Sequence, residues 1–165
     1  MATDWSPIFI SMKTASLSIL ITFFVGLIVA WAIVMIKNDT IKSVLDGIFT
    51  LPLVLPPTVV GFFLLYIFGV RGPIGSFFIE FFAVKIAFSW HATVIAAVVM
   101  SFPLMYRSAR SAFEQVDSNL LDAGRTLGMS EWKIFWKILF ANALPGIIGG
   151  GILAYARGLG EFGAT

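Results

Sequence analysis

The stretch Ser118–Pro145, SNLLDAGRTLGMSEWKIFWKILFANALP, is the one long polar-to-amphipathic insert in a chain made mostly of membrane-length apolar runs. Its pattern predicts two short helices that are separated at Gly128-Met129-Ser130. Ser118 and Ser130 are expected at the helix N-caps, because a serine oxygen accepts the free N–H groups of a first helical turn. The turn from Gly124 to Gly128 is small enough for the surface of another protein to come close to the backbone. An insert of this kind beside a membrane indicates a docking platform.

The composition around this insert is that of an integral membrane protein. Of the 165 residues, 59% are hydrophobic and 12% are charged, whereas about a quarter of the residues of a soluble domain are charged. The chain has no cysteine, which excludes disulfides and thiolate chemistry. Its net charge of +2 is too small to indicate a nucleic-acid partner. The apolar composition instead predicts that membrane lipid surrounds the chain.

Four apolar runs have the length of membrane spans, since about 20 helical residues cross a bilayer. They cover residues 14–36, 48–68, 88–106 and 144–162. We therefore predict an all-α, polytopic bundle of transmembrane helices that forms a single domain over residues 1–165. The chain ends at Thr165, directly after the fourth run, which predicts a truncation at the C-terminus and at least one further span beyond it.

Between the second and third runs, residues 69–85 are too short and too charged to cross a membrane. Gly69, Gly72, Pro73 and Gly75 predict a turn, and phenylalanines then recur at helical spacing around Glu80. This pattern favours a helix that lies in the membrane interface.

The distribution of lysine and arginine predicts the orientation. If the insert at residues 107–143 is cytoplasmic, that side collects Lys37, Lys42, Arg107, Arg110, Arg125, Lys133 and Lys137. The outer side then carries Lys13, Arg71 and Lys85. This asymmetry predicts an external N-terminus in a multi-pass protein of the cell membrane.

The residues that intrinsic catalysis requires are missing from the sequence. There is no G-x-x-x-x-G-K-[ST] loop to hold ATP, and one histidine without cysteine makes no ordinary zinc site. We therefore expect no catalytic residue, metal or cofactor in this chain. An intramembrane enzyme, the alternative from a different class, needs clustered ionisable residues within the spans, where Glu161 is the available carboxylate.

Two of the runs contain candidates for a transport pathway. Pro56, Pro57 and Thr58 interrupt the second run, because proline removes an N–H group and clashes with the preceding turn. Such a break exposes backbone groups that line the route of a solute, or else it is a kink needed only for packing. Ser101 and Pro103, near the end of the third run, are further candidates.

The fourth run combines a flat face with two charges. Gly146, Gly150, Ala154 and Gly158 recur every four residues, a pattern that lets helices pack closely in lipid and that we assign to helix packing, including packing between two copies of the chain. Arg157 and Glu161 are also four residues apart and are expected to pair. Charges within a span are candidates for the pathway or its gate.

The insert resembles the coupling loop of binding-protein-dependent ABC importers, which follows the pattern EAA-x3-G-x9-I-x-LP. Asp122-Ala123-Gly124 corresponds to its beginning, Gly128 to the glycine and Ile138 to the isoleucine. Asp122 replaces the glutamate, Gly124 replaces the second alanine, and Phe140-Ala141 stands at the Leu-Pro position. A Leu-Pro pair follows four residues later, at Leu144-Pro145.

Further stretches resemble the permease subunits of molybdate importers. They are Leu51–Gly61 (LPLVLPPTVVG), Ala87–Trp90 (AFSW), Ser101–Leu104 (SFPL), Arg125–Gly128 (RTLG) and Ala156–Thr165 (ARGLGEFGAT). The resemblance runs in order from about Trp5 to Thr165. Sulfate permeases share a weaker form of the proline-rich run and of the C-terminal stretch, so a sulfate or thiosulfate importer remains the alternative.

The resemblance implies a division of labour. A separate ABC ATPase subunit would use ATP and Mg²⁺ and dock on the coupling loop, at Asp122, Ala123, Gly124, Arg125, Leu127 and Gly128. An external molybdate-binding protein would deliver molybdate or tungstate, and a second permease copy would complete the pore as a homodimer. The apolar side of the second short helix, Trp132, Phe135, Trp136 and Leu139, would anchor the loop to the membrane part.

Overall fold

The computed structural model describes residues 6–82, 85 and 89–160, and within these ranges the chain is helical and contains no strand. In chain order the elements are α1 Ser6–Val34, α2 Asp39–Val54, α3 Pro57–Phe68, α4 Pro73–Phe82, α5 Trp90–Glu114, α6 Ser118–Thr126, α7 Glu131–Ile134, the π-helix η1 Phe135–Leu139 and α8 Phe140–Gly160. The all-α fold class is confirmed. Three of the described helices are long and apolar enough to cross a membrane, and a fourth span results if the bent pair α2–α3 counts as one.

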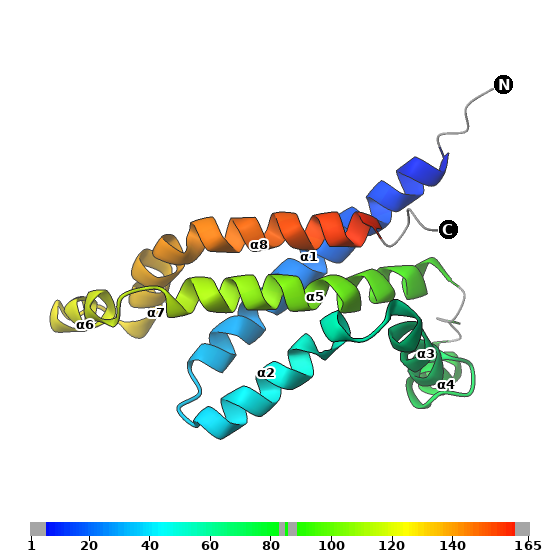
Figure 1. The fold of residues 1–165 in the computed structure, drawn as a ribbon, viewed down its shortest axis with the longest axis horizontal. Coiled ribbons are helices and arrows are strands. Elements are labelled where there is room, and N and C mark those ends of the chain that lie inside the picture. Colours follow the sequence, from blue (N-terminus) through cyan, green and yellow to red (C-terminus); the bar gives the residue numbers. More distant parts are fainter. Residues whose placement is uncertain (1–5, 83–84, 86–88, 161–165) are drawn as a thin grey trace.

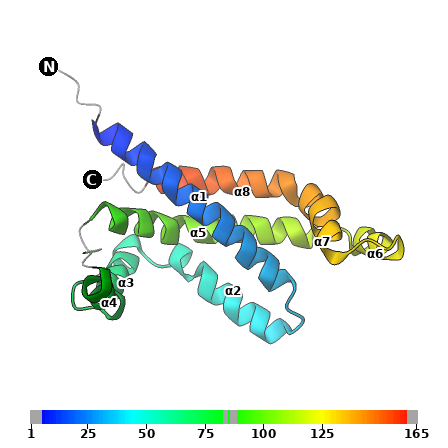
Figure 2. The same ribbon diagram turned by 180° about the vertical axis from the view of Figure 1, so that it is seen from behind.

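The long helices α1, α5 and α8 lie side by side along the length of the molecule (Figures 1 and 2). The central helix α5 contacts both others, and its Met105 and Tyr106 are fully buried. Helix α1 comes close because Gly26 has no side chain: a Cβ there would lie 2.8 Å from Met105 Cγ. Lipid is as apolar as these side chains, so close packing rather than exclusion from water holds the helices together.

The small-residue face of α8 packs within the chain. A Cβ at Gly146 would lie 2.7 Å from Ala112 Cβ, and one at Gly150 would overlap Ser108 Cβ, both on α5. Ala154 is buried, and Gly158 faces Ser18 on α1. The interpretation that this face joins two copies of the chain is therefore wrong, because α5 and α1 already cover it.

The second apolar run, expected as a span over residues 48–68, is not a single helix. It contains the last part of α2 and all of α3, and the two helices meet at an angle of 110°. Pro56 is the N-cap of α3 and Pro57 its first residue, so the missing N–H of Pro57 falls where a helix needs none. The break follows from the prolines, whereas its size comes from the packing.

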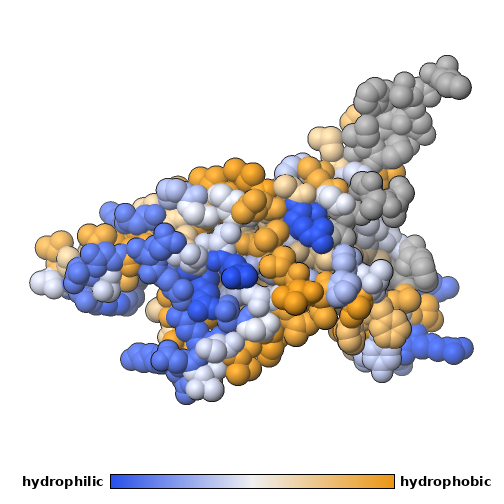
Figure 3. Space-filling model, viewed as in Figure 1, coloured by the Kyte–Doolittle hydropathy of each residue, from blue (hydrophilic) through white to orange (hydrophobic). Residues whose placement is uncertain are grey.

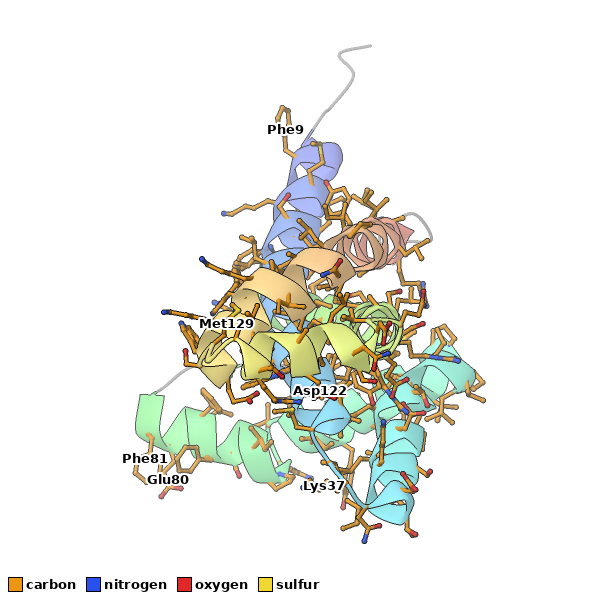
Figure 4. The ribbon with its side chains drawn as sticks, turned by 90° about the vertical axis from the view of Figure 1, so that its left-hand side faces the viewer. Phe9, Lys37, Glu80, Phe81, Asp122 and Met129 are labelled. Carbon is orange, nitrogen blue, oxygen red and sulfur yellow. The ribbon has the colours of Figure 1, made fainter. Side chains whose placement is uncertain are left out.

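Helix α5 does not end where the third apolar run does. It continues to Glu114, eight residues past the expected end at 106, because Arg107–Glu114 are compatible with a helix even though they are polar. Helix α4 forms after the predicted turn, with Phe77 and Phe81 exposed on its surface. Figure 4 shows Glu80 and Phe81 projecting from this helix at the edge of the molecule.

The elements separate into two ends. The α1–α2 connection and α6 lie toward one end, while α3, α4 and the start of α1 lie toward the other (Figures 1 and 2). Figure 3 shows hydrophilic residues gathered at the α6 end, whereas apolar residues dominate the middle of the visible face. This distribution fits a bundle with an apolar waist in lipid and a polar end in water.

Candidate functional site

The segment between α5 and α8 forms a folded-back unit at one end of the bundle. In Figure 4, which looks at this end, Asp122 and Met129 lie at the front, across the ends of the long helices. Helix α6 ends before Gly128, whose φ of 72° lies in the left-handed region that glycine adopts without a steric penalty. The predicted separation of two helices at Gly128-Met129-Ser130 is confirmed.

The helix caps agree with the sequence at one of two positions. Ser130 is the N-cap of α7, although its side chain makes no capping hydrogen bond. The N-cap of α6 is Asp117 instead of Ser118, and its carboxylate accepts the N–H of Asn119 at 2.9 Å. Aspartate and serine are equally good caps, so adjacent residues of these types do not fix the first turn.

Gly124 provides close packing inside the chain rather than access for a partner. It is buried, and a Cβ at this position would lie 2.8 Å from Ile138 Cδ1 and 3.2 Å from Ile134 Cγ1. Helix α6 therefore rests on α7 and η1 through its smallest residue. The neighbouring Ala123 is exposed, so a partner would meet this alanine and not the glycine.

Arg125 fixes the angle between α6 and α7. Its Nη1 donates to Asp122 Oδ1 at 2.7 Å, and its Nε and Nη2 donate to the two carboxylate oxygens of Glu131 at 2.8 and 3.2 Å. The hydrogen bonds with Glu131, and then those with Asp122, raise the pKa of the Arg125 guanidinium. A two-pronged contact of this kind fixes orientation as well as distance. Asp122 and Arg125 thus shape the turn that the motif predicted.

The second short helix is anchored by part of the predicted apolar side. The Phe135 ring packs 5.0 Å from the ring of Trp31 on α1, and Leu139 is buried. Trp132 and Trp136, in contrast, are 67% and 44% exposed, so assigning them to the anchor was wrong. The five-residue π-helix η1 changes the register between α7 and α8, and the wider turn leaves these two rings outside.

Large apolar side chains of this unit are exposed in the described chain. Leu127, directly after α6, is 80% exposed. Leu120 on α6 and Trp132 on α7 are exposed as well. Monomeric soluble surfaces seldom present large apolar side chains together, and such patches mark interaction sites. The unit therefore offers a few exposed apolar side chains to a partner, among the hydrophilic residues of this end.

The pathway candidates of the second run lie together at the α2–α3 break. Pro56, Pro57 and Thr58 are all exposed there. The last helical hydrogen bond of α2 is kept at the break, because the N–H of Leu55 donates to the carbonyl of Leu51 at 3.1 Å. The geometry leaves both alternatives open, a lining segment and a packing kink.

Ser101 and Pro103 are not on an exposed wall. Ser101 is 1% exposed, donates to the Ala97 carbonyl at 2.6 Å and lies 3.1 Å from Thr22 Oγ1 on α1. Pro103 is also buried. Ser101 belongs to the α1–α5 packing and Pro103 is buried, so the structure does not support assigning either residue to the pathway. A serine in an apolar run signals polarity, but its helical face decides whether it meets water or a neighbour.

Arg157 lies in the last turn of α8 and is half-buried. Its expected partner Glu161 lies outside the described residues, so the predicted pairing stays a prediction.

Sequence reasoning missed a cluster of charged residues between α2 and α5. Arg110 pairs with Asp46 and, at 3.1 Å, with Glu114, while Lys42 pairs with Glu114 at 2.7 Å. The buried Tyr106 donates to Asp46 at 3.0 Å. The available signal was spacing, since Lys42 and Asp46, and likewise Arg110 and Glu114, are four residues apart and share a helix face. These pairs tie α2, which has no buried residue of its own, to α5.

In the described part of the chain, no group of three histidine, aspartate or glutamate side chains gathers as a set of metal ligands.

The chain matches the family of binding-protein-dependent transport system inner membrane components over residues 8–165. It is 48% identical to the molybdenum transport system permease protein ModB of Escherichia coli K12, over 98% of this chain and 70% of that protein. It is 41% identical to ModB of Haemophilus influenzae, over 97% of this chain and 69% of that protein. A probable sulfate transport system permease protein, cysT of Chlorokybus atmophyticus, is 33% identical over 94% of this chain and 54% of its own length.

Proposed function

The chain belongs to the family of binding-protein-dependent transport system inner membrane components, and from this premise we propose that it is the permease subunit of an ATP-driven molybdate importer. One observation carries the choice of substrate: identity is 48% with a permease named for molybdenum and 33% with one named for sulfate. Tungstate, a tetrahedral dianion like molybdate, is expected to travel the same route. The relatives are transport subunits, so this chain is a membrane transport protein and not an enzyme.

The α6–α7 unit is the receiver of motion in this proposal. An ATPase subunit docks on the exposed side chains around Ala123 and Leu127, while Arg125 keeps α6 and α7 at a fixed angle. A unit with a rigid interior transmits displacement, because packed elements move as bodies. Phe135 and Leu139 connect the unit to the long helices.

Further components complete the importer. The ATPase subunit binds and hydrolyses ATP with Mg²⁺, an external binding protein delivers the oxyanion, and a second copy of the permease forms the other half of the pore. The small-residue face of α8 is not available for that second copy, because α5 covers it. The dimer contact therefore uses another surface of the bundle.

The proposed orientation puts the α6 end in the cytoplasm and the N-terminus outside. Lys42 pairs with Glu114 at the end of α5 near α6, whereas Lys13 lies 5.0 Å from the ring of Trp90 at the other end of α5. The basic residues assigned to opposite sides from the sequence are thus at opposite ends of the same helix. Their excess at the α6 end supports a cytoplasmic loop.

Uptake of labelled molybdate tests the substrate. The complete transporter is produced in cells that lack their own molybdate uptake, and uptake is measured with and without a large excess of sulfate. We expect uptake to be unaffected by sulfate. Strong competition by sulfate would replace this proposal by the second candidate, a sulfate or thiosulfate permease, which the identity to the cysT protein favours.

Crosslinking tests the docking site and the orientation. A thiol crosslinker on Ala123→Cys should capture the ATPase subunit from the cytoplasmic face. Tyr66→Cys, exposed on α3 at the other end, is the matched control and should react from outside. Reaction of Ala123→Cys from the external face alone would refute the orientation.

A further inference from the structure

A groove of about 830 Å³ lies between α5 and α8 at the α6 end of the bundle. The side chains Arg107, Ser108 and Ser111 of α5 line one side. Asn142, Gly146 and Gly149 of α8 line the other, and Asp117 lies at its mouth where α6 begins. The groove is large enough for a hydrated oxyanion, and its walls carry polar groups.

Arg107 brings a positive charge into this groove that the described chain does not neutralise. Three residues further along α5, Arg110 is paired with Asp46 and Glu114 on the α2 side of the helix. Arg107 is exposed, and within the described ranges it is in no ion pair. A cation close to the membrane without a partner is a candidate for contact with a mobile anion.

Serine hydroxyls and side-chain amides are the other uncharged polar groups of the groove. Gln115 donates to Ser111 Oγ at 2.9 Å, a bond that does not use the Ser111 hydroxyl hydrogen. Asn142 donates to the Ile138 carbonyl at 2.7 Å on its own helix. Hydroxyl and guanidinium donors are the groups that bind a tetrahedral oxyanion, which has only acceptors.

The carboxylate of Asp117 does not cancel this preference. It accepts the N–H of Asn119 and caps α6. Asp117 follows the end of α5 at Glu114, whereas Arg107 lies about two helical turns before that end. The Asp117 carboxylate is engaged at the helix cap, and within the described residues it forms no ion pair with Arg107.

We propose that this groove is the inner vestibule of the anion route, with Arg107 as its cation and with the Ser108 and Ser111 hydroxyls as donors. The inference rests on the proposed function, since it requires an oxyanion as the cargo. It replaces the buried Ser101 and Pro103 by residues one to three turns further along the same helix. A single guanidinium in a water-filled groove binds weakly, which permits release into the cell.

The absence of cysteine makes a direct test possible. Ser108→Cys and Ser111→Cys are introduced singly, and Ser101→Cys, on the same helix but buried, is the matched control. The complete transporter is assembled in inside-out vesicles and treated with water-soluble thiol reagents that leave either a sulfonate or a trimethylammonium group. The unsubstituted transporter, treated in the same way, measures any effect of thiols in the partner subunits.

We expect both groove cysteines to react and Ser101→Cys to remain unmodified. The sulfonate adducts should lower molybdate uptake about tenfold, because a fixed negative charge repels the anion, and the trimethylammonium adducts should lower it much less. Arg107→Gln should reduce uptake, and Arg107→Lys should restore most of it. Assembly with the ATPase subunit, measured by co-purification, should be unchanged in both variants, since Arg107 is exposed.

Failure of this inference is distinct from failure of the proposed function. If the unsubstituted transporter takes up sulfate and no molybdate, the proposed substrate is wrong, and the adducts are then compared with labelled sulfate. If it takes up molybdate but the groove cysteines do not react, or the two reagents have equal effects, the groove is not the vestibule. Equal uptake by Arg107→Gln and the unsubstituted protein would also overturn the role of Arg107.

Discussion

Replacing Gly150 by alanine should loosen the α5–α8 interface, because the added Cβ would overlap Ser108 Cβ. Ser108 Cβ is bonded directly to its backbone and cannot rotate away, so the helices must separate. Overpacking of this kind costs about 1–3 kcal/mol. Alanine in place of glycine within a helix contributes about 1 kcal/mol in the opposite direction. The net change is therefore a modest loss in the free energy of unfolding.

Gly149 is the matched control, because it is next to Gly150 in α8 and a Cβ there meets nothing within 4 Å. Gly149→Ala has the same helix-propensity gain without the overlap. The difference in unfolding free energy between the two variants should therefore equal the steric part alone, about 1–3 kcal/mol. Unfolding is followed by circular dichroism in mild detergent micelles titrated with a denaturing detergent.

A double-mutant cycle identifies the contact. Ser108→Gly removes the atom that the new Cβ would meet, so it should rescue Gly150→Ala and should have no such effect on Gly149→Ala. Equal stability of the two alanine variants, or the absence of rescue, would refute the packing of α8 on α5.

Three further predictions concern the turn, the buried hydroxyl and the coupling unit. Gly128→Ala should destabilise the α6–α7 turn by about 1–2 kcal/mol, because a residue with a side chain is strained in the left-handed conformation. The added Cβ meets no neighbouring atom, so this backbone strain is the whole effect. Faster proteolysis of the loop should report it. Tyr106→Phe should lower the unfolding free energy by about 0.5–1.5 kcal/mol, because the hydrogen bond to Asp46 is lost. Tyr66→Phe, at an exposed tyrosine, is the control and should have no effect. Equal effects of the two substitutions would contradict the role of the Tyr106 hydroxyl. Arg125→Ala should leave the stability of the bundle unchanged but reduce the transport achieved per ATP hydrolysed by the assembled importer, and unchanged coupling would show that the fixed α6–α7 angle is dispensable.

The polar insert and its break were predictable because they depend on local chemistry. Gly128 supplies the one backbone conformation that terminates α6, and the change from apolar to amphipathic residues marks where the chain leaves the membrane. The interruption of the second run follows in the same way from Pro56 and Pro57. Length, apolarity and turn residues act over a few positions and are visible without a fold.

The roles of several single residues were not predictable, because they depend on which helix faces meet. Gly124 has the sequence features of an accessible surface, yet it packs on Ile134 and Ile138. Ser101 has those of a pathway lining, yet it lies against Thr22, 79 positions away along the chain. The spacing of Lys42 and Asp46 showed that they share a helix face, but not that Arg110 of α5 lies opposite Asp46.

The sequence by itself determined that this is an all-α membrane protein with a family-specific loop, since hydrophobic length and motif spacing are properties of consecutive residues. Only the tertiary structure decided that the glycine face of α8 is covered by α5 and that Arg107 opens into a groove while Arg110 is neutralised. The physical reason is that helical periodicity fixes which residues share a face, whereas the neighbour of that face is set by packing between segments distant in the chain.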